Sequence, residues 1–417
     1  MNFFTETTGF YKGNKPPELV AKYGSPLYAY SEEILRQCCR DMAGLIKYPK
    51  FKSNFSIKAN SNLELLKIVK QEGLHADAMS PGEIHVLLAA GFSPDEIFYV
   101  SNNVSAEEML FAIERGICTS VDSLSQLHLF GTLNPGGKVA VRFNPGAGAG
   151  HHEKVITAGK KTKFGVNTDM AGEVASIAKE FGLKIVGINQ HIGSLFMEGD
   201  AYIEGVRTLL ALADKYGEEF QDLEFVDFGG GFGIPYRKQE GQARLELKEF
   251  GIKLDGIVSE WMKRYGREIK VKIEPGRYIV AECGVLLGTV YALKQNYSIH
   301  FVGTDLGFNV LARPVMYDSH HDIEVYRNGE VITCCTNKIQ TIVGNICESG
   351  DIIAKERSLS EIHEGDILGV MDAGAYGFAM SSNYNNRLKP TEILIAPDGS
   401  TRLIRRRDTL DDLMRNF

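Results

Sequence analysis

One lysine stands where its amine could do covalent chemistry. The segment Phe55–Asn60 places Lys58 in a short apolar strand and follows it at once with a polar turn. Lysine is rarely buried, and an amine withdrawn from water is suited to forming a Schiff base with a carbonyl group. A strand-end lysine that extends its ammonium group to water explains the same segment. The segment alone leaves both interpretations open.

A histidine and a serine end another apolar run. In the segment Gln190–Ser194, the ring of His191 could stack on a flat cofactor ring, and the hydroxyl of Ser194 could bind a phosphate oxygen. A hydrogen-bonded histidine at a strand end is the structural alternative.

Three consecutive glycines, Gly229, Gly230 and Gly231, follow a third apolar run. Glycines leave backbone N–H groups accessible to an anion, which is how many phosphate groups are held. The segment does not fit the dinucleotide-binding pattern, because Ile234 stands where its last glycine is required. A phosphate loop and a simple tight turn both remain possible interpretations.

Two acidic residues complete the candidate chemistry. Glu274, in the segment Ile273–Arg277, is predicted at a buried strand end, where a carboxylate needs a cationic partner. A pyridinium nitrogen or Arg277 could be that partner. The pair Cys347 and Glu348 places a thiol beside a carboxylate, which suits proton transfer, although an isolated cysteine is more often a buried structural residue.

No metal site is expected. The pairs His151-His152 and His320-His321 are adjacent, so their side chains point in opposite directions in an extended segment, and no cysteine or carboxylate cluster completes a ligand set.

Eight apolar, strand-like runs alternate with helical patterns between about residues 54 and 275, which predicts a (β/α)₈ TIM barrel. A doubly wound open sheet is the alternative. In both folds functional residues gather at the carboxyl ends of the strands, where Lys58, His191, Gly229 and Glu274 are predicted. The expected strands are Asn54–Lys58, Leu74–Met79, Ile97–Ser101, Ile117–Val121, Lys138–Asn144, Ile185–His191, Leu223–Phe228 and Ile269–Glu274.

Strands dominate after about residue 280, which predicts a second, all-β domain. The apolar run Pro26–Tyr30 is expected to add a strand to it. We therefore expect a barrel domain over residues 36–280 and a β-sandwich or barrel-like domain over residues 1–35 and 281–417.

The bulk composition is that of a globular protein of two domains. The chain has 417 residues, 44% of them hydrophobic, and a net charge of −7, which argues against nucleic acid or an anionic membrane as the main partner. No apolar run approaches the length of a membrane span, and the N-terminal segment does not have the pattern of a signal peptide. Seven cysteines without a zinc-binding spacing favour a reducing cytoplasm.

Taken together, these motifs resemble the fold-type III decarboxylases that use pyridoxal 5'-phosphate (PLP). The resemblance covers essentially the whole chain and rests on an ordered set of motifs. They are Lys58-Ala59-Asn60, His191-Ile192-Gly193-Ser194, Gly229-Gly230-Gly231, Glu274-Pro275-Gly276-Arg277, Arg313-Pro314-Val315-Met316-Tyr317, Cys347-Glu348-Ser349-Gly350-Asp351, Gly374-Ala375-Tyr376-Gly377 and Tyr384-Asn385-Asn386-Arg387. It implies a barrel of the alanine-racemase type with a C-terminal β domain.

The resemblance also implies a role for each residue. Lys58 is expected to bind PLP covalently, His191 to stack on its ring and Glu274 to pair with its ring nitrogen. The phosphate is expected to be held by Ser194, Gly229, Gly230, Gly231, Gly276, Arg277 and Tyr376. The substrate is expected to contact Arg277, Arg313, Tyr317, Glu348 and Tyr376. Cys347, contributed by a second subunit, is expected to help protonate the product carbon, so that a homodimer shares its active sites.

The expected reaction is decarboxylation of meso-2,6-diaminopimelate to L-lysine and CO₂, the last step of lysine biosynthesis. Two arginines suit a substrate with a second carboxylate. The alternatives are decarboxylation of another amino acid (D-lysine, D-ornithine or carboxynorspermidine), amino-acid racemisation, and a non-catalytic relative. The pairing of Cys347 with Glu348 fits decarboxylation better than racemisation, and a non-catalytic relative tends to lose the lysine or the thiol.

Overall fold

The computed structural model describes residues 3–146, 159, 162–333 and 337–417. These residues divide into two compact units. The first comprises Met1–Gln37, Pro235–Ala243 and Val280–Phe417, and the second comprises Cys38–Ile234 and Arg244–Ile279. Pro235–Ala243, inside the barrel domain expected from sequence, belongs to the first unit. None of the helices in the described part of the chain has both the length and the apolarity that crossing a membrane requires.

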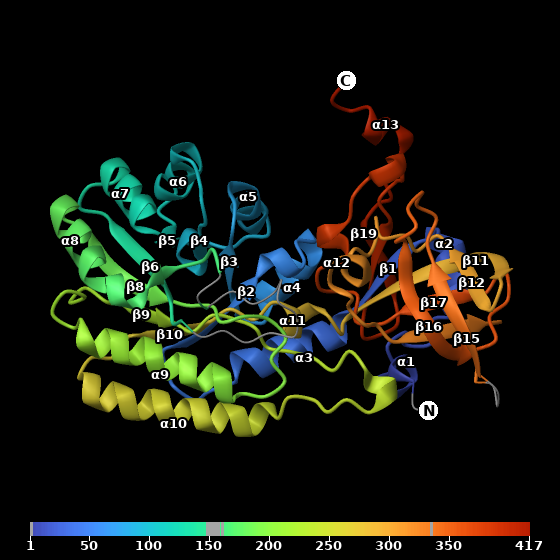
Figure 1. Ribbon diagram of the computed structural model, residues 1–417, viewed down its shortest axis with the longest axis horizontal. Helices are drawn as coiled ribbons and strands as arrows, with labels where there is room; N and C mark the ends of the chain where they lie inside the picture. Colours follow the sequence, from blue (N-terminus) through green and yellow to red (C-terminus); the bar gives the residue numbers. More distant parts are fainter. Residues whose placement is uncertain (1–2, 147–158, 160–161, 334–336) are drawn as a thin grey trace. The chain divides into compact units, whose positions relative to one another are not determined.

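The second unit is built on eight parallel strands that close into a barrel, which confirms the predicted fold (Figure 1). The ring closes where β5 pairs with β6 and where β10 pairs with β2. The strands are β2 (Phe51–Ser56), β3 (His75–Ala78), β4 (Ile97–Val100), β5 (Cys118–Val121), β6 (Lys138–Asn144), β8 (Lys184–Asn189), β9 (Phe225–Asp227) and β10 (Lys270–Ile273). A short strand, β7 (Val166–Asn167), pairs with β6 outside the ring.

Helices surround these strands (Figure 1). They are α3 (Glu32–Ala43), which leads into the unit, α4 (Leu63–Gln71), α5 (Pro81–Ala89), α6 (Ala106–Ile113), α7 (Leu124–Leu133), α8 (Ala171–Phe181), α9 (Asp200–Lys215) and α10 (Leu247–Tyr265). Polar residues begin four of them, because the side chains of Asn62, Ser80, Ser105 and Ser123 accept hydrogen bonds from backbone N–H groups of the first turn. These caps fix the turns that follow β2 to β5.

An apolar cluster fills part of the barrel interior. The rings of Phe98 and Phe225 meet edge to face with centroids 5.3 Å apart, and Val100, Ala140 and Val186 pack with them. Burial of such side chains is the main stabilising contribution to the barrel. It holds the strand ends that carry the polar residues described below.

The first unit is built on one ten-stranded sheet, with the path β14-β13-β17-β11-β1-β18-β19. Strand β1 lies antiparallel to β11 and parallel to β18, so the early apolar run does add a strand. The strands are β1 (Leu27–Ser31), β11 (Gly284–Asn296), β12 (Ile299–Thr304), β13 (Ile323–Arg327), β14 (Glu330–Val331), β15 (Asn337–Val343), β16 (Ile352–Ser360), β17 (Ile367–Val370), β18 (Thr391–Ile395) and β19 (Thr401–Arg405). Its short helices include α1 (Phe4–Thr7), α2 (Pro16–Tyr23), α12 (Arg313–Tyr317) and α13 (Leu410–Leu413), and α11 (Arg277–Val280) leads into it.

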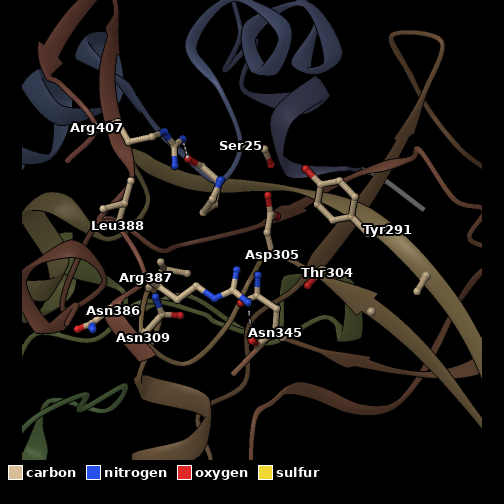
Figure 2. Close-up of a pocket in the computed structure, with 15 residues that line it drawn as sticks. Ser25, Tyr291, Thr304, Asp305, Asn309, Asn345, Asn386, Arg387, Leu388 and Arg407 are labelled. Carbon is tan, nitrogen blue, oxygen red and sulfur yellow. Dashed lines mark hydrogen bonds between the residues drawn. The ribbon is translucent and has the colours of Figure 1, made fainter. Parts of the chain in front are cut away.

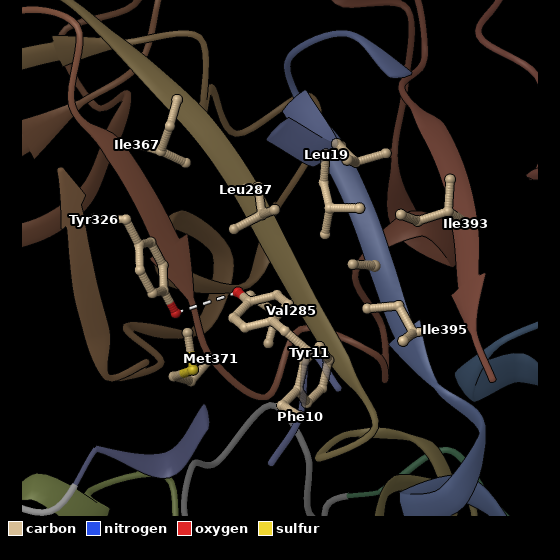
Figure 3. Packing of buried hydrophobic residues seen from close by; sticks show 12 residues of the cluster. Phe10, Tyr11, Leu19, Val285, Leu287, Tyr326, Ile367, Met371, Ile393 and Ile395 are labelled. Atoms are coloured by element: carbon tan, nitrogen blue, oxygen red, sulfur yellow. Dashed lines mark hydrogen bonds between the residues drawn. The ribbon is translucent and has the colours of Figure 1, made fainter. Parts of the chain in front are cut away.

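Apolar side chains from distant parts of the chain form the core of this unit (Figure 3). Leu19 of α2 packs with residues of β1, β11 and β18, including Leu287 and Ile393. The hydroxyl of Tyr11 donates a hydrogen bond to that of Tyr326 over 3.2 Å, so this core also satisfies its polar groups. The N-terminal segment is therefore an integral part of the β unit.

Candidate active site

Lys58 lies just beyond the carboxyl end of β2. The predicted strand ran to Lys58, but β2 ends at Ser56 and residues Ile57–Ala59 form a 3₁₀ turn, labelled η1. The backbone turns after Ser56, and the N–H of Asn60 donates to the Ile57 carbonyl oxygen over 3.0 Å. The hydroxyl of Ser56 donates to Asp77 of β3 over 2.8 Å. The Lys58 side chain is half-buried. The turn brings the Lys58 side chain near the carboxyl ends of the strands, where its charge acts on Glu274 and Asp77.

Three buried carboxyl groups lie at neighbouring strand ends. Glu274 follows β10 and is 4% exposed, and Asp77 of β3 and Asp227 of β9 are fully buried. Asp77 Oδ2, Asp227 Oδ2 and Glu274 Oε1 have no hydrogen-bond partner among the residues that the structure describes. Burial raises the pKa of all three groups, and the charge of Glu274 raises the pKa of Asp77 and Asp227 further.

Three cations oppose this effect. Lys58, Arg142 and Lys272 lower the pKa of Glu274, although burial dominates. Arg142 lies on β6 and is 7% exposed, and Lys272 lies on β10. The site is therefore a mixed-charge cluster in which Glu274 keeps one unpaired oxygen for a further positive partner.

Sequence reasoning missed four members of this cluster: Asp77, Asp227, Arg142 and Lys272. A usable signal was present, because each is a charged residue with an apolar residue on either side in a barrel strand, where charge is costly.

His191 is held as a neutral ring. The backbone N–H of Gly230 donates to His191 Nδ1 over 3.0 Å, so the ring proton resides on Nε2. Burial holds the pKa of His191 well below its usual value, and the charges of Lys58 and Arg142 lower it further. A neutral imidazole presents a flat apolar face, which suits the stacking expected from sequence.

The three glycines form a cradle that larger residues could not occupy. A Cβ on Gly230 would overlap the carbonyl oxygen of Glu274, and one on Gly229 would overlap that of Gln190. Gly229 also has φ of +75°, which favours glycine, and its N–H donates to Asp227 Oδ1 over 2.9 Å. The backbone after β9 is therefore packed directly against His191 and Glu274.

Ser194 and Arg277 lie together at the edge of this cradle. The guanidinium of Arg277 donates to Ser194 Oγ over 3.0 Å, and the Arg277 side chain is buried. Gly276 approaches Ser56 and Ala59 so closely that a Cβ would lie 3.0 Å from the Ser56 Cβ. A hydroxyl, a guanidinium and glycine backbone thus lie close to Lys58, a composition that suits an anionic group such as phosphate.

The remaining predicted residues lie in the β unit. Arg313 is fully buried, Tyr317 and Tyr376 are half-buried, and Cys347 and Glu348 are exposed. Tyr376 adopts φ of +57°, a strained value for a residue with a bulky side chain.

No metal site emerges in the described residues, since no three His, Cys, Asp or Glu side chains are arranged to hold an ion. His151 and His152 lie outside the described residues. His320 instead contacts Asp322 over 2.9 Å, and His321 contacts the Met371 carbonyl oxygen over 2.7 Å.

Asp227→Asn should stabilise the cofactor-free protein at neutral pH. The raised pKa means that the folded state retains the Asp227 proton more strongly than the unfolded state. The protein therefore loses stability as the pH rises from the ordinary Asp pKa of 3.8 through the higher pKa of Asp227 in the folded state. We expect the variant to be more stable than the wild type at pH 7, with a higher Tm, and to gain almost nothing at pH 4.

The measurement is Tm against pH by calorimetry. Asp169→Asn, an exposed position in the same unit, is the control and should show no such trend. If the difference in Tm between Asp227→Asn and the wild type did not change with pH, the prediction would be wrong.

The geometry at the barrel fits the cofactor that the sequence motifs imply. Glu274 Oε1 is an unpartnered acceptor, His191 offers a neutral ring, and the glycine cradle with Ser194 and Arg277 suits a phosphate group. Lys58 supplies the amine. Each part of PLP has a complementary group within this one unit.

Comparison with known proteins agrees with this geometry. Residues 32–281 match the family model described as pyridoxal-dependent decarboxylase, pyridoxal binding domain. Diaminopimelate decarboxylase from Methanothermobacter thermautotrophicus is 42% identical over 405 residues, which is 95% of this chain and 92% of that protein. The Escherichia coli K12 enzyme of the same name is 34% identical, covering 95% of this chain and 94% of its own.

A solved structure extends the likeness to three dimensions. The crystal structure of diaminopimelate decarboxylase from Helicobacter pylori complexed with L-lysine superposes with a TM-score of 0.86 at 31% identity, over 95% of this chain and 98% of that one. The match spans both units, so it includes the β domain that the family model leaves out. The chain therefore belongs to the pyridoxal-dependent decarboxylases and, within that family, to the diaminopimelate decarboxylases.

Proposed function

We propose that this protein uses PLP to convert meso-2,6-diaminopimelate to L-lysine and CO₂, the last step of lysine biosynthesis. The observation that carries the proposal is the arrangement of Lys58, His191 and Glu274 beside a glycine cradle, in a chain that matches diaminopimelate decarboxylases over nearly its full length.

Each site residue has a distinct task. Lys58 would hold the cofactor through its amine, and the phosphate would be held by Ser194, Gly229, Gly230, Gly231, Gly276, Arg277 and Tyr376. PLP, when bound, supplies an electron-withdrawing ring that accepts the electron pair left when CO₂ departs. Glu274 would pair with the ring nitrogen through its unpartnered Oε1 and so favour its positive charge. His191 would cover a ring face without adding charge, because burial holds the pKa of its imidazole well below the usual value.

Arg313 is the best-supported residue for recognising the distal carboxylate. Its guanidinium donates to His321 Nε2 over 2.7 Å, and Ser319 Oγ accepts a second hydrogen bond over 3.3 Å. The Tyr236 ring centroid lies 4.5 Å from the guanidinium carbon. Because His321 Nδ1 donates to the Met371 carbonyl oxygen, the ring offers Nε2 as an acceptor, which fixes the guanidinium plane. We propose that Tyr317, Arg277, Glu348 and Tyr376 complete the substrate contacts.

The first test is release of CO₂ and L-lysine from meso-diaminopimelate by the PLP-loaded protein. Arg313→Lys should raise KM about 10- to 100-fold with a smaller change in kcat, because an ammonium group cannot reproduce the planar, bidentate fork of arginine. Arg327→Lys is the matched control, since Arg327 pairs with Asp366 in the same unit. Equal KM values for the two variants would remove Arg313 from the substrate site.

We also propose a homodimer in which Cys347 acts in the partner's active site. Cys347 and Glu348 are both exposed on the described chain, although proton delivery to a product carbon requires a site shielded from water. A second subunit would cover them and complete the site.

We propose that the protein is located in the cytoplasm. The five cysteines in the described part of the chain are all free thiols, and free thiols persist under reducing conditions. They are Cys38, Cys39, Cys118, Cys283 and Cys347.

A further inference from the structure

The loop that carries Cys347 and Glu348 is braced from inside by Asp351. The backbone N–H of Ile346 donates to Asp351 Oδ2 over 2.8 Å, and that of Phe308 donates to Oδ1 over 2.7 Å. The Gly344 N–H donates to the Asp351 carbonyl oxygen over 3.1 Å, which closes the base of the loop. The loop therefore has a defined shape although its tip is exposed.

A second contact reaches Cys347 itself. Asn385 lies in the 3₁₀ turn Tyr384–Asn386, labelled η7, far from the loop in sequence. The Cys347 N–H donates to Asn385 Oδ1 over 3.0 Å, and Asn385 Nδ2 donates to Cys347 Sγ over 3.1 Å. The Asn385 amide thus contacts both the backbone N–H and the thiol of Cys347. It can do so because an asparagine side chain carries both an acceptor and a donor.

The residues on either side of Asn385 hold the loop at its flanks. The hydroxyl of Tyr384 donates to Glu348 Oε1 over 2.5 Å. Arg387 donates to the Asn345 carbonyl oxygen over 3.0 Å, a bond that Figure 2 shows. Two residues of the turn and the arginine that follows it therefore contact three residues of the loop, in opposite order along the two segments.

The turn has an unusual backbone that asparagine tolerates. Asn385 has φ of +56° and Asn386 has φ of +53°, both in the left-handed region. Asparagine enters this region more readily than most residues. The strained turn points the Asn385 amide at the loop, whereas the Asn386 side chain makes no hydrogen bond within the described residues.

We propose that Asn385 is a positioning residue for Cys347, holding its thiol in one orientation and favouring the sulfur when it carries negative charge. A donated hydrogen bond stabilises an anionic acceptor, and Nδ2 is the donor here. This inference rests on the proposed function for its consequence in catalysis, but the contact itself is independent of substrate.

The test compares Asn385→Gly with Asn386→Gly in the PLP-loaded, full-length protein. Glycine accepts the left-handed backbone without strain, so both variants carry the same local change, and only the first loses an amide that contacts Cys347. Two quantities are measured: kcat and KM for meso-diaminopimelate, and the rate at which iodoacetamide alkylates Cys347 at pH 7 without substrate, followed by mass spectrometry of the Cys347 peptide.

Asn385→Gly is expected to lower kcat about 10- to 100-fold with KM changed less than about two-fold, because a displaced proton donor affects the chemical step more than binding. It should also slow Cys347 alkylation several-fold, since the thiolate is the reactive form. Asn386→Gly should match wild type in both. Asn385→Asp keeps the acceptor but replaces the donor with a negative charge, so alkylation should remain slow.

Three outcomes decide the matter. Equal kcat and equal alkylation rates for Asn385→Gly and Asn386→Gly would overturn the inference, and so would wild-type alkylation in Asn385→Asp. If the wild type releases no lysine but Asn385→Gly alone slows alkylation, the proposed function fails and the role of Asn385 stands.

Discussion

Lys58→Ala is expected to abolish covalent attachment of PLP and to lower decarboxylation of meso-diaminopimelate at least about 10³-fold. Lys58 is the amine placed by η1 beside Glu274 and the strand ends, and its charge lowers the pKa of Glu274. Borohydride reduction followed by peptide mass spectrometry should find the cofactor mass on Lys58 in the wild type and on no lysine in the variant.

Lys52→Ala is the matched control. Lys52 is exposed on β2, the strand that precedes Lys58, so its removal should leave both the cofactor and the activity in place. A Lys58→Ala protein that still carries the cofactor mass on another lysine would show that we have assigned the wrong amine.

The same variant can test the shared active site. If Cys347 acts in the partner's barrel, Lys58→Ala and Cys347→Ala proteins are each inactive, but mixed dimers contain one intact site. Random pairing of equal amounts should then restore about a quarter of wild-type activity. No recovery, in a mixture shown by native mass spectrometry to contain mixed dimers, would place Cys347 in its own chain's site or outside catalysis.

Glu274→Gln is expected to lower kcat about 10²-fold or more while leaving the cofactor-free protein at least as stable. A neutral amide cannot keep the ring nitrogen positively charged, so the ring accepts electrons less well. The same change removes a negative charge whose burial is costly and which raises the pKa of Asp77 and Asp227. The measurements are kcat with PLP and Tm without it.

Glu224→Gln is the control for this change, because Glu224 is an exposed residue paired with Lys138. Exposed pairs contribute little to stability, so neither quantity should move much. A strongly reduced Tm in Glu274→Gln would assign Glu274 a structural role, and an unchanged kcat would exclude it as the partner of the ring nitrogen.

The elements of the barrel could be predicted from sequence because their signals are local. Apolar runs indicate the strands, and polar caps such as Asn62 and Ser105 indicate where helices begin. The eight strand–helix units can therefore be predicted without tertiary information. Strand β16 gives no such local signal, because its Lys355-Glu356-Arg357 centre lacks the apolar pattern of a core strand. Its pairing with β15, and not its composition, makes it a strand.

The sequence predicted an amine, a histidine, a glycine run and a carboxylate at strand ends, and the resemblance of these motifs to a known family indicated the chemistry. It could not reveal that Asp77, Asp227 and Glu274 share one buried cluster, or that Asn385 holds Cys347 and His321 holds Arg313. These relations depend on hydrogen bonds and electric fields between segments that are distant in sequence. Only folding brings such groups within the few ångströms over which these forces act.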